Sequence, residues 1–296
     1  MCSAEGNAPT PSDGSSNGPT APPTVPPIAS LNVSGSNPLG YESINDRRTP
    51  PIPIRGTFLF VPRNAPRMSF DPDAVETITV DSYGTLVDPS AAVDALDDHV
   101  EATESISDVW RTKSIEYTMI GNFVDGYQPF YAMNRDALRY ALAAHDVDLP
   151  EDTVEGILSV YHELEVFEDV RDGIGRLVDG GYPVYVLSNG NPEMLEHLVS
   201  AADLGGLIAG TISAAEIERY KPDSAIYRHA ATRTDTPIDG ILHASGGGMR
   251  DVWGAKHAGM KAAWLSRPGE SVPREEFGRD PDVVVESLHD LADRLE

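Results

Sequence analysis

Residues 76–87 read Glu-Thr-Ile-Thr-Val-Asp-Ser-Tyr-Gly-Thr-Leu-Val and contain the first strand and turn of the predicted fold. The β-branched run over 76–81 predicts a strand that ends at Asp81, and a glycine-containing turn follows it. An aspartate at the end of a strand can present its carboxylate to a ligand among backbone N–H groups. Aspartate also forms Asx turns and helix caps routinely, so from this turn alone both interpretations stay open.

Strands and helices alternate through the second half of the chain. Further strands are predicted over 183–188, 207–213, 241–245, 262–266 and 283–285, and helices over 169–178, 192–201, 224–232, 251–258 and 288–295. This alternation is typical of an α/β fold with a parallel sheet covered on both faces, here a Rossmann-like core. Ligands bind such sheets outside the carboxyl ends of the strands, so we expect Asp81, Ser188 and Ser245 to border one crevice.

Helical patterns fill the chain between the first strand and the others. Apolar residues recur at helical spacing over 91–100, 107–123, 136–144 and from Pro150 onward. We therefore predict a core formed by residues 68–88 and 169–296. Residues 89–168 are expected to form an inserted helical cap over the crevice.

Residues 1–67 differ in composition from the rest. Prolines lie among Ser, Gly, Asn and Thr with little apolar periodicity, and such a segment buries too little surface to offset its ordering entropy. Two explanations stay open: a disordered N-terminal extension, or a coding start assigned too early, since Met68 lies just before the first strand.

The charge of the chain is strongly negative. Asp and Glu number 47 against 22 Lys and Arg, a formal net charge of −25. Such a field repels nucleic acid and anionic membranes, and no apolar run is long enough to span a bilayer. Neither a secretory signal nor an apolar segment after Arg47-Arg48 is evident, so we expect a cytoplasmic protein. The spread of acids with few lysines favours a halophilic origin; an ordinary acidic cytosolic enzyme is the alternative.

The cysteine and histidine content argues against a metal centre. Cys2 is the single cysteine, which excludes an internal disulfide and a Cys-rich zinc site. The eight histidines show no His-x-x-x-His or His-Glu-x-x-His pairing. We expect neither a metal nor an organic cofactor.

Four segments resemble the ordered motifs of the haloacid dehalogenase superfamily. They are Val80–Val87 with Asp-x-Tyr-Gly-Thr-Leu, Val186–Leu195 with Leu-Ser-Asn-Gly-x-Pro, Tyr220–Tyr227 and, more loosely, Ser245–Ala255 with Asp251 in the expected place. Two helical segments, Val109–Thr118 and Arg135–Leu142, are similar to those of the 2-haloacid dehalogenases. The resemblance covers roughly residues 75–270.

This resemblance implies hydrolytic dehalogenation of short L-2-haloacids to 2-hydroxyacids, with a small anionic substrate and water as partners. Asp81 would attack the carbon that bears the halogen, with inversion, and form an ester while halide leaves. Water would then hydrolyse this ester at the Asp81 carboxyl carbon. A carboxylate nucleophile thereby divides one hard displacement into two easier steps. Members of the family often dimerise, so a homodimer is also expected.

The resemblance also gives roles to further residues. Around the nucleophile, Lys221 would keep Asp81 ionised and Thr85 would orient its carboxylate. Asp251 would pair with Lys221 and help place the water. Around the substrate, Arg111 would bind the halide or the carboxylate, Ser188, Asn189 and Tyr227 would supply hydrogen bonds, and Tyr83 would line the pocket. Each has a simpler alternative: Arg111 as a solvated helix residue, Ser188 and Asn189 as a helix cap, Lys221 as part of a common loop pair, and Tyr227 as core packing.

Tyr83 decides the branch of the superfamily. Its phosphatases place a second aspartate two residues after the nucleophile and bind magnesium beside it, whereas this chain has Tyr83 there. A tyrosine, with an ordinary pKa near 10, replaces a carboxylate poorly in acid–base catalysis, and Asp88 lies too far along the chain. A magnesium-dependent phosphatase and a non-catalytic relative remain the alternatives.

The fourth motif departs from the family pattern. Gly246–Gly248 stand where dehalogenases commonly carry Ser and Asn, and Arg250 stands where Trp often precedes the final aspartate. Backbone N–H groups of a glycine run could replace the side-chain donors or cradle an anion. Alternatively, ester hydrolysis is slow. Arg250 in place of Trp indicates a pocket of different polarity, and the departure leaves substrate range and efficiency open.

Overall fold

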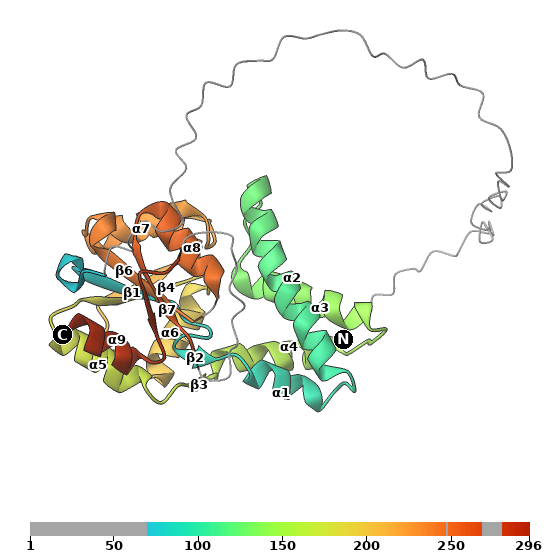
Figure 1. Cartoon of the computed structure of the whole chain (residues 1–296). Helices are drawn as coiled ribbons and strands as arrows, with labels where there is room; N and C mark the ends of the chain where they lie inside the picture. The colour runs from blue at the N-terminus through green and yellow to red at the C-terminus, as the bar shows by residue number, and fades with distance from the viewer. Residues whose placement is uncertain (1–69, 247, 268–279) are drawn as a thin grey trace, which may run out of the picture. The chain divides into compact units, whose positions relative to one another are not determined.

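A parallel sheet forms the centre of the fold in the computed structural model, which describes residues 70–246, 248–267 and 280–296. The predictions for residues 1–67 lie outside the described residues. Within them the sheet has six strands in the order β5-β4-β1-β6-β7-β8, all paired in parallel (Figure 1). The strands are β1 (Thr77–Val80), β4 (Val184–Ser188), β5 (Gly210–Ser213), β6 (Ile241–Ser245), β7 (Lys261–Leu265) and β8 (Val283–Val285). The predicted α/β class with a parallel sheet is thus confirmed.

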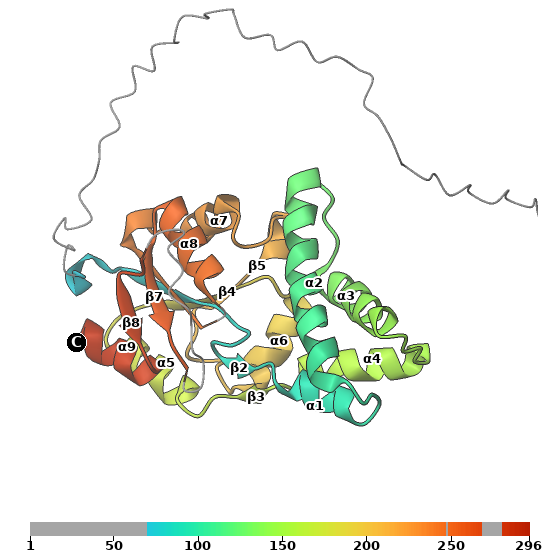
Figure 2. The same cartoon turned by 45° about the vertical axis from the view of Figure 1, so that its right-hand side comes forward.

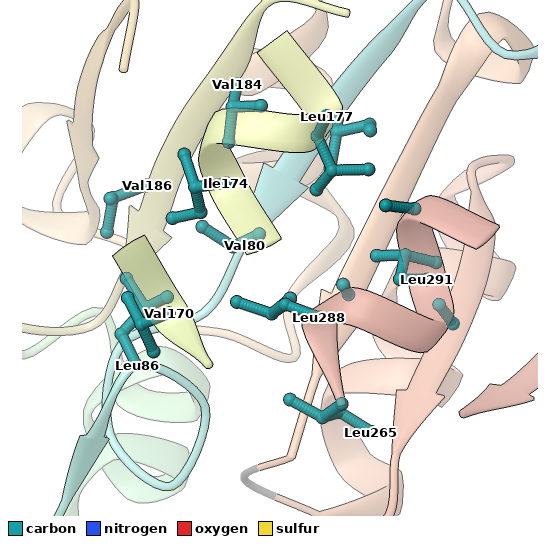
Figure 3. Close-up of a cluster of buried hydrophobic side chains, with 14 of the residues drawn as sticks. Val80, Leu86, Val170, Ile174, Leu177, Val184, Val186, Leu265, Leu288 and Leu291 are labelled. Carbon is teal, nitrogen blue, oxygen red and sulfur yellow. The ribbon is translucent and has the colours of Figure 1, made fainter. Parts of the chain in front are cut away.

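Helices cover both faces of this sheet because its strands carry apolar side chains on both sides. On one face lie α5 (Val170–Asp179), α6 (Pro192–Ala201) and α9 (Leu288–Leu295), and on the other lie α7 (Ser224–Thr234) and α8 (Met249–Ala258). Figure 3 shows the hydrophobic core on the first of these faces, in which leucines of α5 and α9 lie beside valines of β1 and β4.

The alternation of side chains along β6 assigns its residues to the two faces. Leu242 and Ala244 belong to the core under α5 and α9, whereas Ile241 packs with α7 and α8. The ring of His243 is fully buried and meets Tyr227 of α7 edge-on, at 5.6 Å between centroids. His243 therefore lies on the side of the sheet that α7 and α8 cover.

Four helices are inserted between β2 (Val87–Asp88) and β3 (Glu165–Val166), which pair with each other in antiparallel fashion. They are α1 (Ala91–Asp97), α2 (Thr103–Val124), α3 (Phe130–Ala144) and α4 (Glu151–Ser159). Figures 1 and 2 show them gathered on one side of the sheet. They bury a hydrophobic cluster of their own, centred on residues such as Trp110, Leu138 and Leu158.

Some element boundaries differ from the sequence predictions. Helix α3 begins at Phe130 instead of residue 136, because Pro129 precedes it and Asn191 accepts the N–H of Tyr131 at 2.9 Å. This contact joins residues 60 positions apart, so no local pattern indicates it. Strand β5 begins at Gly210 instead of 207, because the N–H groups of Leu207 and Ile208 turn back to Leu204.

Helix α2 begins at Thr103, four residues earlier than predicted. The short β2–β3 pair was not predicted at all, since two residues carry no periodic signal. Among the described residues, none of the helices combines the length and the hydropathy that a membrane span requires.

Candidate active site

The carboxyl ends of β4, β1 and β6 lie side by side and bring three polar residues to one edge of the sheet. Asp81 follows β1, and Ser188 and Ser245 end β4 and β6. A cavity of about 130 Å³ opens at this edge. Its lining comprises Asp81, Tyr83, Ser188, Asn189, Lys221, Pro222, Arg250 and Asp251 from the sheet side, and Ser114, Ile115, Thr118, Met119 and Phe130 from α2 and α3.

The ammonium group of Lys221 lies between two carboxylates. Its Nζ donates to Oδ1 of Asp81 at 2.6 Å, to Oδ2 of Asp251 at 2.5 Å and to the carbonyl of Leu187 at 3.0 Å. Only 3% of the lysine side chain is exposed. Because an ammonium group has three protons, these three acceptors occupy all of its donors.

Burial and charge set the protonation of these groups. Burial raises the pKa of Asp81, and the nearby Asp251 raises it further, while Lys221 opposes both. Burial also disfavours the charged form of Asp251, but the attraction of Lys221 and the contact with His243 together outweigh it and hold that pKa below its ordinary value. The two carboxylates likewise raise the pKa of Lys221 against the effect of burial. Asp251 is therefore the first of the pair to ionise, and Lys221 stays protonated.

Thr85 holds the second oxygen of Asp81. Its Oγ1 donates to Asp81 Oδ2 at 3.3 Å and accepts the N–H of Gly246 at 2.8 Å. A Cβ atom at position 246 would lie 2.3 Å from the carbonyl oxygen of Gly84, so the position requires glycine. Gly246, the first glycine of the run, thus allows its backbone to lie close to Gly84, and its N–H group then orients the hydroxyl of Thr85.

Ser188 and Asn189 line the cavity but are engaged in loop contacts. Ser188 Oγ shares a hydrogen bond with Ser82 Oγ at 2.6 Å and accepts the N–H of Gly190 at 3.0 Å. The side chain of Asn189 accepts the N–H of Lys221 at 2.7 Å and donates to its carbonyl at 3.3 Å. Asn189 therefore fixes the backbone that carries Lys221.

Asp251 has further partners beneath the cavity. Its Oδ2 accepts from Ser245 Oγ at 3.2 Å, and its carbonyl accepts from the hydroxyl of Tyr227 at 3.2 Å. His243 also approaches it, with Nε2 at 3.6 Å from Oδ2, while Nδ1 lies 2.9 Å from the hydroxyl of Thr79. Sequence reasoning missed His243, although it is the one ionisable side chain in β6, whose other residues are Ile, Leu, Ala and Ser.

Aromatic rings form one wall of the cavity. Tyr83 stacks on Phe130 at 6.1 Å between centroids and meets Tyr161 edge-on at 5.6 Å. The Tyr83 hydroxyl is buried without a hydrogen-bond partner among the described residues. Burial, with smaller effects of Tyr161 and Asp81, raises the pKa of Tyr83 far above its ordinary value. Tyr83 is therefore a neutral phenol at physiological pH.

The structure does not bring every predicted site residue to the cavity. Asp81, Lys221, Asp251, Thr85, Ser188, Asn189 and Tyr83 lie together, and Tyr227 touches Asp251 from beneath. Arg111 is exposed on α2 and is not part of the lining. Its charge still acts on Tyr161: burial raises the pKa of this tyrosine, and Arg111 lowers it. Arg250, which received no role from the sequence, lines the cavity instead.

The described residues also offer no alternative metal centre. No group of three or more His, Cys, Asp and Glu side chains within residues 70–246, 248–267 and 280–296 is placed to hold an ion.

The sequence matches the family of haloacid dehalogenase-like hydrolases over residues 75–259. It is 31% identical over 222 residues to (S)-2-haloacid dehalogenase H-109 of Pseudomonas putida, which covers 75% of this chain and 98% of that enzyme. It is also 31% identical over 206 residues to (S)-2-haloacid dehalogenase 4A of Burkholderia cepacia, with coverage of 69% and 88%.

Solved structures of L-2-haloacid dehalogenases are also similar to this chain. A crystal structure of an L-2-haloacid dehalogenase shares 30% identity and a TM-score of 0.71, covering 75% of this chain and 98% of that one. The L-2-haloacid dehalogenase of Xanthobacter autotrophicus, solved with chloropropionic acid covalently bound, shares 26% identity and a TM-score of 0.67, with coverage of 74% and 97%.

Proposed function

Since the chain belongs to the haloacid dehalogenase-like hydrolases, we propose that it hydrolyses short L-2-haloacids to 2-hydroxyacids through an ester on Asp81. Its relatives identify it as a hydrolase that acts on carbon–halide bonds. The proposed ester rests on the position of the Asp81 carboxylate, which lines the cavity. One of its oxygens accepts a hydrogen bond from Lys221 and the other accepts one from Thr85. A relative with chloropropionic acid covalently bound supports the covalent route.

In the first step an oxygen of Asp81 forms a bond to C2 of the substrate, and the carbon–halogen bond breaks. Halide leaves with the bonding electrons, and the Asp81 ester forms with inversion at C2. Lys221 assists because its charge favours the ionised nucleophile against the effect of burial. The neutral, apolar ring of Tyr83 walls the cavity in which the carbon chain would lie.

In the second step the oxygen of water adds to the carboxyl carbon of Asp81, and the ester bond to that carbon breaks. The 2-hydroxyacid leaves with an oxygen that came from Asp81, and one proton is released. Asp251, whose pKa is held low, stays ionised and is suited to accept a hydrogen bond from the attacking water. Ser245 and Lys221 hold its carboxylate in place.

We further propose that residues 89–168 act as the cap of this site, as the sequence indicates. Support comes from α2, whose residues Ser114, Ile115, Thr118 and Met119 line the same cavity as Asp81. Arg111 lies on the same helix, one turn before Ser114. We propose that it assists the departing halide from the side of Tyr161.

The donor set does not fit the magnesium ion of a related phosphatase. Tyr83 supplies no carboxylate, and the ammonium of Lys221 lies between Asp81 and Asp251 where a cation would otherwise bind them. This arrangement favours the dehalogenase over the phosphatase.

Halide release tests the proposal. Wild-type enzyme should release chloride from L-2-chloropropionate in high salt with a chelator present, and Asp81→Asn should not. Absence of halide release, together with magnesium-dependent cleavage of p-nitrophenyl phosphate by the wild type, would move the protein to the phosphatase branch.

A further inference from the structure

The cavity contains a cation that the mechanism above does not use. Of its described lining residues, Asp81 and Asp251 carry negative charge and Lys221 and Arg250 carry positive charge. Lys221 donates to three protein acceptors and has no donor left for a ligand. Arg250 is therefore the lining cation that remains available.

The position of Arg250 suits it to contact a ligand. It is the second residue of α8 and directly precedes Asp251, at the carboxyl edge of the sheet. Its side chain is half-buried, and it makes no hydrogen bond or ion pair with another residue in the part of the chain that the structure describes. A guanidinium stays charged at any physiological pH and binds a carboxylate through two parallel N–H donors.

The charge of Arg250 balances the net negative charge of the other lining residues. With Asp81, Asp251 and Lys221 alone the described lining would carry a net charge of −1, which repels an anionic acid. Arg250 brings the lining to neutrality. Arg111, the arginine to which the resemblance gave a role, is exposed and outside the lining.

We propose, on the basis of the proposed dehalogenase function, that Arg250 binds the substrate carboxylate and makes the enzyme selective for free haloacids. The carboxylate lies on the guanidinium at the α8 side of the cavity. The substituent on C2 faces the apolar side formed by Ile115, Met119 and Phe130. Uncharged analogues such as haloamides lack the group that Arg250 recognises.

The test compares chloride release from L-2-chloropropionate and from its amide. The wild type should prefer the acid in kcat/KM by on the order of 10- to 100-fold, the effect of one charge-assisted hydrogen-bonded pair. Arg250→Met should raise KM for the acid by a similar factor and remove most of this preference. Arg250→Lys should retain part of it. Arg228→Met removes a cation from the exposed face of α7 and serves as the control for net charge.

A wild type without preference for the acid, or an Arg250→Met enzyme with the wild-type acid-to-amide ratio, would overturn the assignment. A fall in kcat with the ratio unchanged would also overturn it, because a structural role affects both substrates alike. If the wild type releases no halide, the proposed function fails instead. Calorimetric binding of propionate then decides the assignment: Arg250→Met must bind it more weakly than wild type and Arg228→Met, and equal binding contradicts the inference.

Discussion

The Nζ atom of Lys221 lies 2.6 Å from Oδ1 of Asp81, although 140 residues separate the two in the chain. The strand order places β4 next to β1, and the loop that carries Lys221 is fixed to the end of β4 by Asn189. This contact makes the ionisation of Asp81 depend on one lysine.

Replacement of Lys221 by methionine should shift the acid limb of kcat/KM to higher pH. Asp81 attacks only when ionised, so activity is lost as pH falls through its pKa. Burial raises this pKa and Lys221 opposes the rise, so removal of the lysine raises it further. The expected shift is roughly one to three pH units, the effect of a close opposite charge. Lys256→Met, which removes a cation paired with Asp282 outside the site, is the control. An unchanged pH profile would show that Lys221 does not control Asp81.

Replacement of Arg111 by alanine should lower kcat on L-2-chloropropionate while the circular dichroism spectrum stays unchanged. Arg111 is exposed, so its loss leaves the hydrophobic cluster of α1–α4 intact. Loss of one cationic group that stabilises departing charge costs roughly 100-fold in kcat. Arg139→Ala on α3, where the arginine pairs with Glu151, is the matched control. Turnover equal to that of the control would overturn the proposed role of Arg111 at the departing halide.

Tyr83→Phe should leave the protein at least as stable as the wild type. The Tyr83 hydroxyl is buried without a partner among the described residues, and an unsatisfied buried hydroxyl costs about 1–3 kcal/mol. The matched control is Tyr182→Phe, whose hydroxyl donates to the carbonyl of Leu295 at 3.2 Å. This control should lose about 1 kcal/mol in the free energy of unfolding. Urea titration measures both variants, and a Tyr83→Phe enzyme less stable than wild type would reveal a hidden partner.

The thermal midpoint should rise between low and molar KCl. With a formal net charge of −25, the acidic side chains repel one another and destabilise the folded state. Salt weakens this repulsion because it shortens the screening length from about 10 Å at 0.1 M to about 3 Å at 1 M. The same titration nearer the isoelectric point of ≈ 4.5 should show a smaller rise, because less charge remains to be screened. A midpoint that does not rise with salt at pH 7 would argue against a halophilic origin.

The elements that the sequence predicted well are those with strong local patterns. All six strands of the sheet lie where β-branched and apolar runs indicated, because buried parallel strands need such residues on both faces. The first turn of α3 and the β2–β3 pair escaped prediction, since both depend on partners distant in sequence.

The site was predictable only where residue order carried information. Asp81, Lys221 and Asp251 meet because a parallel sheet brings successive strand ends together. A sequence does not state which way a helix residue points. The position of Arg250 beside Asp251 indicated a change in pocket polarity, but the sequence could not show that Arg111 lies outside the lining, nor that His243 approaches Asp251.

The origin of the product oxygen distinguishes an ester on Asp81 from direct attack of water on the substrate. With enzyme in excess over L-2-chloropropionate in ¹⁸O-labelled water, a single turnover should yield lactate whose hydroxyl oxygen is unlabelled. The peptide that contains Asp81 should gain one ¹⁸O atom, detected by mass spectrometry, because water attacks the carboxyl carbon. Labelled lactate with an unlabelled Asp81 peptide would mean that water attacks the substrate directly and that no Asp81 ester forms.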